Sequence, residues 1–213
     1  LLGIVTVDEI VDVIREEATE DFLQMAGAGK DREILMKSSW DNARSRLPWL
    51  FASWIGGVCA AAIIGIFDNT LQSTLALAAF IPVVIGMGGN IGTQTSTLVV
   101  RGLATGRVNV GNNINIIFKE IRVGLILGVL YGLLLGLFAI MRFVDISPYL
   151  GLVVGLGIAC SMLIATAFGS FVPLLFHRMD IDPAIATGPF VTTSIDILGV
   201  TLYFVIAKIF LPV

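Results

Sequence analysis

Five long apolar segments constrain this chain more than any other feature of its sequence. They span residues 47–67, 71–100, 121–141, 149–176 and 183–210. Each is at least as long as the stretch of about 20 apolar residues with which a helix crosses a bilayer. A hydrophobic content of 56% with 14% charged residues and a mean hydropathy of +0.94 exclude an ordinary soluble domain. We therefore predict an all-α integral membrane protein with five transmembrane helices.

The region before the first span is acidic. Seven carboxylates fall between Asp8 and Asp21, and several lie four residues apart, a spacing at which like charges destabilise a helix. One interpretation is a solvated helix face. The other is a cation site, because hard divalent cations take oxygen ligands. The composition favours neither, and the candidate ligands are Asp12, Glu17, Glu20 and Asp21.

Two further patterns surround these acids. Residues 1–7, LLGIVTV, predict a short buried strand, and apolar residues at helical spacing continue to Ile14. Gly27 and Gly29 end the predicted amphipathic helix. Residues 34–49 then combine tryptophan with basic residues, which is typical of a helix that lies along the membrane surface and leads into the first span.

One carboxylate stands inside the last apolar segment. Asp196 lies 13 residues from Pro183 and 14 from Phe210, which predicts a position near the membrane midplane. A charge there costs about 3 kcal/mol on insertion scales, so such residues normally face a bundle interior or a water-filled path. The alternative is a protonated Asp196 that hydrogen-bonds to a neighbouring helix. The nearby hydroxyls of Thr192 and Thr193 favour the water-filled path.

Residues 82–103, PVVIGMGGNIGTQTSTLVVRGL, are the second unusual stretch. The glycines lack the Gly-Lys-Ser/Thr ending of a phosphate loop. They predict either a kinked, closely packed helix or, as we favour, non-helical backbone. In the second case the carbonyl groups would line a polar path together with Asn90 and Gln94.

Small residues recur at every fourth position in the third and fourth spans. The set is Gly124, Gly128, Gly132, Gly136, Gly151, Gly155 and Ala159. Such spacing lets membrane helices approach closely, and it predicts a tight bundle. The cysteines, Cys59 and Cys160, have no metal-site or redox spacing and are interpreted as small hydrophobic residues.

The basic residues predict the orientation of the spans. With the N-terminus in the cytoplasm, ten bases near the spans lie inside, whereas only Arg142 and Lys208 lie outside. The positive-inside rule therefore predicts a multi-pass protein of the cell (inner or plasma) membrane whose C-terminus is outside. No basic patch interleaved with aromatic residues suggests a nucleic-acid partner.

Several motifs together resemble the MgtE family of magnesium channels. They are the G-x-G-G-N-x-G-x-Q segment from Gly86 to Gln94, H-R-M-D-I-D-P-A at 177–184 and T-T-S-I-D-I-L-G at 192–199. The acidic E-A-T-E-D at 17–21 is similar to the family's connecting helix, and L-L-G-I-V-T-V-D-E-I to the tail of its second CBS domain. The resemblance covers essentially the whole chain.

The resemblance implies a Mg²⁺-selective channel and not an enzyme. It implies a homodimer in the lipid bilayer, with the pore on the dimer axis and Asp196 of both subunits selecting the ion. It also implies that cytosolic Mg²⁺ binds between regulatory domains and the connecting helix and closes the gate. The expected parts are a CBS-domain remnant at 1–14, the acidic connecting helix and interfacial helix at 15–46, and the pore domain at 47–213. Most of the regulatory region is expected to lie outside this sequence, so sensing by this chain alone is expected to be weak.

The residue chemistry agrees with a magnesium path. Mg²⁺ gives up water reluctantly and meets one or two carboxylates through its waters, which suits two copies of Asp196. Thr192, Thr193 and the backbone near Gly199 are expected to contact those waters. Asp182 suits a second cation site at the cytoplasmic mouth, and it also suits a helix N-cap before Pro183; the two roles are compatible.

Two other functional classes stay open. A secondary-active divalent cation transporter would use the same Asp196 by cycling its protonation. An intramembrane aspartyl protease needs two facing carboxylates, and only a dimer of this chain would supply them, so this is the weakest of the three hypotheses.

Overall fold

The computed structural model describes residues 3, 5–28, 36–108, 113–144 and 146–211, and these are almost entirely helical. The elements are α1 (Val7–Met25), α2 (Ser39–Ile66), α3 (Asp68–Ser73), a 3₁₀ helix (Leu75–Phe80), α4 (Ile81–Ala104), α5 (Asn113–Arg142), α6 (Leu150–Arg178), α7 (Ala184–Thr187) and α8 (Pro189–Phe210). Five helical segments within these ranges are long and apolar enough to cross a membrane. The predicted all-α fold with five spans is confirmed.

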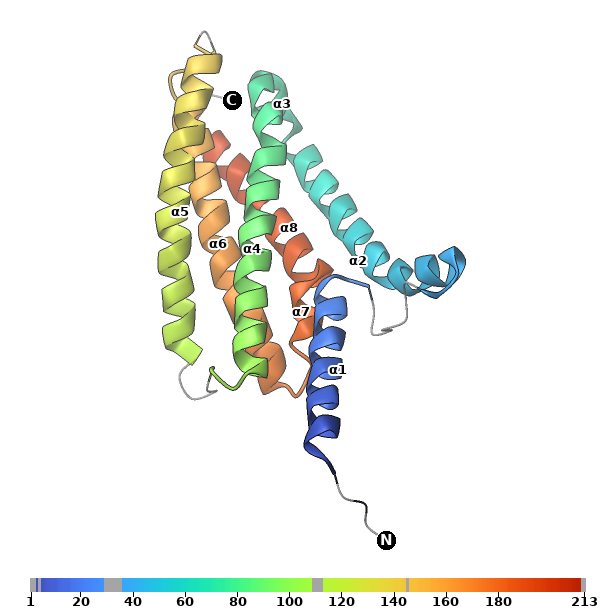
Figure 1. The fold of residues 1–213 in the computed structure, drawn as a ribbon. Helices are drawn as coiled ribbons and strands as arrows, with labels where there is room; N and C mark the ends of the chain where they lie inside the picture. Colours follow the sequence, from blue (N-terminus) through green and yellow to red (C-terminus); the bar gives the residue numbers. More distant parts are fainter. Residues whose placement is uncertain (1–2, 4, 29–35, 109–112, 145, 212–213) are drawn as a thin grey trace.

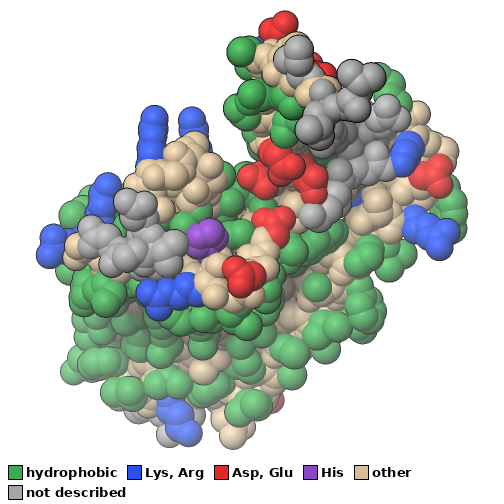
Figure 2. All heavy atoms as spheres, turned by 90° about the horizontal axis from the view of Figure 1, so that it is seen from below, with side chains coloured by type: hydrophobic (Ala, Val, Ile, Leu, Met, Phe, Trp, Pro, Cys, Tyr) green, Lys and Arg blue, Asp and Glu red, His purple; other side chains and the backbone are tan. Residues whose placement is uncertain are grey.

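The bundle is built around α6, which packs against α4, α5 and α8. Figure 1 shows α5 and α2 on opposite sides of the bundle, with α4, α6 and α8 between them. The short α7 lies beside α1. We call the end of the bundle that carries α1 the α1 end, and the opposite end, where α3 lies, the far end. Bases cluster at the α1 end, and Figure 2 shows Lys and Arg side chains around its rim.

Local signals fix both ends of α1. Thr6 and Glu9 form a capping box, in which the backbone N–H and the hydroxyl of Thr6 donate hydrogen bonds to the Glu9 carboxylate and lower its pKa. At the other end Gly27 adopts a positive φ of 69°. Its N–H donates to Gln24, and the N–H of Ala28 donates to Leu23, which is the Schellman arrangement. The helix predicted through Ile14 is therefore present. The strand predicted at 1–7 falls partly outside the described residues, and Val7 begins the helix.

The first span begins earlier than its apolar segment. Ser38 caps α2 by accepting a hydrogen bond from the Asp41 N–H, and the helix continues past Pro48 to Ile66. The predicted interfacial helix is thus the first part of α2, which bends away from the rest in Figure 1. Its residues 34–35 lie outside the described residues.

Two apolar clusters hold α4, α6 and α8 together. The far-end cluster includes Leu77, Phe80, Val154, Tyr203 and Phe204, and the buried Tyr203 hydroxyl donates to the Leu77 carbonyl oxygen at 3.1 Å. The second cluster, closer to the α1 end, includes Ile91, Ile158, Met162, Val191 and Ile195. Since both clusters join the same three helices, the position of α8 against α4 is fixed along its length.

The fifth apolar segment is interrupted. Its first residues form the four-residue helix α7, Gly188 breaks the chain direction with a ψ of −140°, and α8 begins at Pro189. The expectation of one helix from Pro183 is wrong, because Asp196 is only eight residues into α8 and lies nearer the α1 end of that helix than its far end.

Candidate functional site

Asp196 lies where α8 crosses α4. Its side chain is half-buried, and a Cβ built on Gly89 of α4 would lie 3.7 Å from its Oδ1. Among the described residues no hydrogen bond or ion pair reaches this carboxylate. A carboxylate without a protein partner inside an apolar bundle is costly, so its place implies contact with water or with a cation.

The glycine-rich stretch is helical, which corrects the expectation of non-helical backbone. α4 runs without a break from Ile81 to Ala104, so its carbonyl groups are used within the helix. The glycines permit close packing instead: a Cβ on Gly88 would lie 2.5 Å from the Ser161 hydroxyl oxygen, and one on Gly169 would lie 2.6 Å from the Gly92 carbonyl oxygen. The absence of a side chain at Gly89 likewise leaves Asp196 uncovered.

The polar side chains of α4 form one exposed face. Asn90 and Gln94 are one helical turn apart and both are exposed. They point away from the buried side of α4, which carries Gly88, Ile91 and Gly92. Exposed amides in a membrane span are expensive against lipid, so this face needs a polar covering.

A cavity lined by hydroxyl groups and by apolar side chains such as Trp49 and Leu50 lies on the α1 side of Asp196 along α8. Its volume is about 280 Å³, and its lining includes Thr93, Thr192, Ser53, Thr187 and Gly188. Thr93 is one turn beyond Gly89 along α4, and Thr192 is one turn before Asp196 along α8. The Thr187 hydroxyl is buried without a hydrogen-bond partner among the described residues, which is the arrangement expected where water completes the network.

The threonine hydroxyls suit a hydrated cation. Thr192 donates its proton to the carbonyl oxygens of Gly188 and Pro189, so the lone pairs of its oxygen are left to accept. Waters bound to Mg²⁺ act as hydrogen-bond donors toward their surroundings, and hydroxyl oxygens and carboxylates supply the acceptors. The cavity therefore offers hydroxyl acceptors along its wall, and the Asp196 carboxylate lies one helical turn beyond Thr192.

A second carboxylate stands at the α1 end. Asp182 Oδ1 accepts a hydrogen bond from the Ala184 N–H at the start of α7, but the N-cap of α7 is Pro183, one residue later than predicted. Asp182 Oδ2 accepts from the Gln24 side-chain amide at 2.8 Å. Gln24 is 1% exposed, and a Cβ on Gly188 would lie 3.8 Å from its carbonyl oxygen. The C-terminal end of α1 thus forms part of the cavity wall through Met25, Ala26 and Gly27.

The structure separates the other predicted site residues. Thr193 packs against Gly56 of α2, and Gly199 packs against Ser161 of α6, so neither joins Asn90, Gln94 and the cavity. On α1 Asp12 and Glu17 are exposed, whereas Glu20 and Asp21 are half-buried. No group of three or more His, Cys, Asp or Glu side chains that could hold a metal ion occurs within the described ranges.

Sequence reasoning missed Thr93, Thr187 and Gln24. Thr93 had a usable signal, because it lies four residues from Gly89 and one position before Gln94. Gln24 had none beyond being an amide at the end of an acidic helix, and its partner Asp182 is 158 residues away.

Comparison with known proteins agrees with this geometry. The sequence model of MgtE, described as a divalent cation transporter, matches residues 81–206. The chain belongs to the MgtE family. The MgtE match includes the polar face of α4, Asp182 and Asp196, whereas α1 lies outside it.

Three curated relatives are named magnesium transporter MgtE. The protein of Bacillus subtilis is 38% identical over 211 residues, that of Enterococcus faecalis 37% over 214, and that of Thermus thermophilus 35% over 214. Each alignment covers 99% of this chain but only 46% of the relative. The chain therefore spans about half the length of these MgtE proteins.

Proposed function

We propose that this chain forms a Mg²⁺-selective channel domain that lets magnesium cross the membrane down its electrochemical gradient. The observation that carries the proposal is the Asp196 carboxylate, which has no hydrogen-bond or ion-pair partner among the described residues and lies one helical turn from Thr192 in the wall of the cavity. A hydrated divalent cation supplies a positive charge to balance this carboxylate. The threonine oxygens accept hydrogen bonds from the waters of the ion. Membership of a divalent cation transporter family supports this choice of ion.

We also propose a homodimer, which is supported by the same face. Asn90 and Gln94 are exposed on α4, beside the half-buried Asp196. A second copy related by a twofold axis would remove these amides from lipid and bring two carboxylates to one hydrated ion. The pore in this proposal runs along the axis, and Thr93 and Thr192 line its α1 side.

The proposed orientation places the α1 end in the cytoplasm. The bases at or near this end include Arg44, Arg101, Lys119, Arg122 and Arg178, whereas Arg142 and Lys208 lie at the far end. The positive-inside rule favours this orientation, which puts the N-terminus inside and the C-terminus outside.

The transport mechanism is tested by flux measurements on the purified protein in proteoliposomes. A channel carries Mg²⁺ along its own gradient, and the reversal potential follows that gradient alone. A secondary-active exchanger would instead shift its reversal potential when a Na⁺ or proton gradient is imposed at constant Mg²⁺. We expect no such shift, and a reproducible shift would favour the exchanger. Vesicles that contain the protein but show no Mg²⁺ flux above empty vesicles would contradict both.

We further propose that α1 regulates the path. Its C-terminal end forms part of the cavity wall, and the Gln24 amide donates a hydrogen bond to Asp182. In this proposal the docked helix represents the closed state. Asp12, Glu17, Glu20 and Asp21 remain the proposed ligands of regulatory Mg²⁺, which would stabilise the docked position only if it binds that state more tightly than the open one.

Replacing Gln24 by alanine is expected to raise basal Mg²⁺ flux roughly tenfold. The change removes the amide that donates to Asp182, and a hydrogen bond to a charged group contributes about 1.5 kcal/mol or more, which is a factor of about ten. The measurement is Mg²⁺ influx into proteoliposomes at matched protein density. Thr19→Ala, on the exposed surface of α1, is the control and should behave as the unsubstituted protein. Equal flux through both variants would show that the docking of α1 does not control Mg²⁺ flux.

A further inference from the structure

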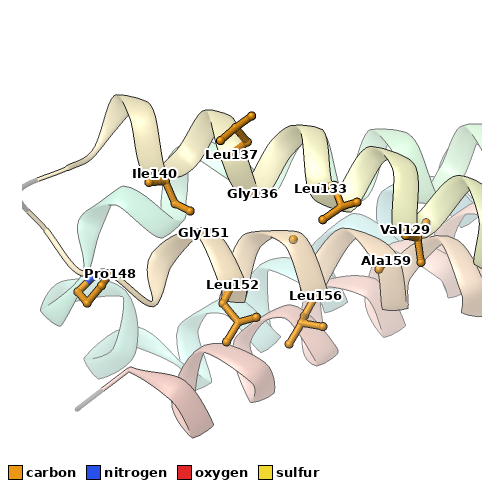
Figure 3. A pocket seen from close by; sticks show the side chains of 13 residues that line it. Val129, Leu133, Gly136, Leu137, Ile140, Pro148, Gly151, Leu152, Leu156 and Ala159 are labelled. Atoms are coloured by element: carbon orange, nitrogen blue, oxygen red, sulfur yellow. The ribbon is translucent and has the colours of Figure 1, made fainter.

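A long apolar groove runs between α5 and α6, away from the ion path. Its volume is about 460 Å³. Figure 3 shows Val129, Leu133 and Leu137 of α5 on one side of it and Leu152 and Leu156 of α6 on the other. It continues to Ile140 and Pro148, where α5 ends and α6 begins.

Backbone contact between the two helices creates the floor of this groove. A Cβ on Gly132 would lie 2.6 Å from the Gly155 carbonyl oxygen, and a Cβ on Gly136 would lie 2.7 Å from that of Gly151. These glycines are mostly buried, whereas the leucines beside them are exposed. The close approach therefore leaves a smooth floor between two rows of large side chains.

Lipid is the medium that faces this groove. α5 contacts the bundle chiefly through α6, and the polar face formed by Asn90 and Gln94 belongs to α4, on the other side of α6 (Figure 1). A second copy that covers the amides and Asp196 therefore leaves the groove open to the bilayer. This placement rests on the proposed dimer through the polar face of α4.

The length of the groove matches one leaflet. Its α5 lining runs from Gly128 to Ile140, which is about 18 Å at 1.5 Å per residue. Half of a hydrocarbon core of about 30 Å is about 15 Å. Gly128 lies at the middle of α5, and Ile140 lies at its far end. The groove thus extends from the far surface of the membrane to its centre, as one acyl chain does.

Arg142 follows the far end of the groove along α5, although it is not among the residues that line the groove. Arg142 is exposed and is the last residue of α5, two positions beyond Ile140. Its guanidinium lies 5.4 Å from the centre of the Phe143 ring. Guanidinium groups pair with phosphate through charge-assisted hydrogen bonds. We propose that the groove holds one acyl chain of a phospholipid from the surrounding bilayer, and that the phosphate of this lipid pairs with Arg142.

The test measures lipid retained by the protein after transfer into nanodiscs of phosphatidylcholine with a minor share of phosphatidylglycerol. Native mass spectrometry counts the phospholipids that remain bound as the nanodisc is stripped. We expect retained phospholipid enriched in phosphatidylglycerol. Leu156→Trp fills the groove from its α6 wall and should lower retention several-fold. Ile126→Trp, which is on α5, exposed and outside the groove, should leave retention unchanged.

Arg142 is tested separately, because replacing it adds no side-chain atoms to the groove. Arg142→Gln is expected to reduce the enrichment in phosphatidylglycerol roughly tenfold, the effect of one charge-assisted hydrogen bond, and Arg142→Lys should restore part of it. The proposal is overturned if the unsubstituted protein retains no phospholipid, or if Leu156→Trp and Ile126→Trp retain the same amount. Disulfide formation between copies through Leu133→Cys would also overturn it, since it would place protein in the groove.

Discussion

Replacing Asp196 by alanine is expected to reduce Mg²⁺ flux roughly 100-fold or more while the protein stays folded. The carboxylate has no protein partner among the described residues and lies one helical turn from Thr192, which lines the cavity. Loss of a charge-assisted contact with the hydrated ion costs about 3 kcal/mol, which corresponds to about two orders of magnitude. Stability should not fall, because the change removes a charge that costs about 3 kcal/mol to insert.

The measurement is Mg²⁺ influx into proteoliposomes together with the thermal midpoint of the same preparation. Asp196→Asn separates charge from shape and should behave like the alanine variant. Ser194→Ala is the matched control, because Ser194 lies on the same helix and donates to the Phe190 carbonyl oxygen; its flux should be unchanged. Normal flux through Asp196→Ala would remove this residue from the ion path.

Replacing Gly132 by leucine is expected to separate α5 from α6 and to lower stability by about 3 kcal/mol. A Cβ at this position would lie 2.6 Å from the Gly155 carbonyl oxygen, and backbone on a neighbouring helix does not yield as a flexible side chain does. Overpacking typically costs about 1–3 kcal/mol, and a leucine adds three more carbons beyond the Cβ. The higher helix propensity of leucine would raise the stability by at most about 1 kcal/mol. The packing clash is larger, so the variant is expected to be less stable.

The control for this prediction is Gly65→Leu. Gly65 lies in α2, and a Cβ there would have no neighbour within 4 Å, so only the propensity gain remains. The two variants are compared by thermal unfolding in the same detergent, followed by size-exclusion chromatography. A midpoint for Gly132→Leu that equals or exceeds that of Gly65→Leu would show that the glycine seam does not hold α5 in place.

The overall fold followed from local properties of the sequence. A long apolar segment has to form a helix in lipid, because every backbone N–H and C=O group must be satisfied internally. The same rule explains the error at α4. Its glycines suggested open backbone, but regular helix from Ile81 to Ala104 satisfies those groups, and whether a glycine serves flexibility or close packing depends on the helix that faces it.

The sequence also identified Asp196 as the exceptional residue, because a single carboxylate in an apolar segment is recognisable wherever the helix begins and ends. It did not show that the segment breaks at Gly188 and shifts Asp196 toward the α1 end of its helix. The sequence could not show for a related reason that Thr193 and Gly199 pack away from the cavity. Neighbours along a helix point in different directions, and only the packing of α2 and α6 showed which of them turn away from the cavity.

Contacts between distant residues were decided by the tertiary structure alone. Gln24 and Asp182 are 158 positions apart, and Gly89 meets Asp196 only because α4 and α8 cross at that height. Apolar length and charge are properties of a segment and can be taken from its composition. Which side chains share a cavity depends on how five helices of similar composition pack, and hydropathy carries no information about that choice because each helix is apolar on most of its surface.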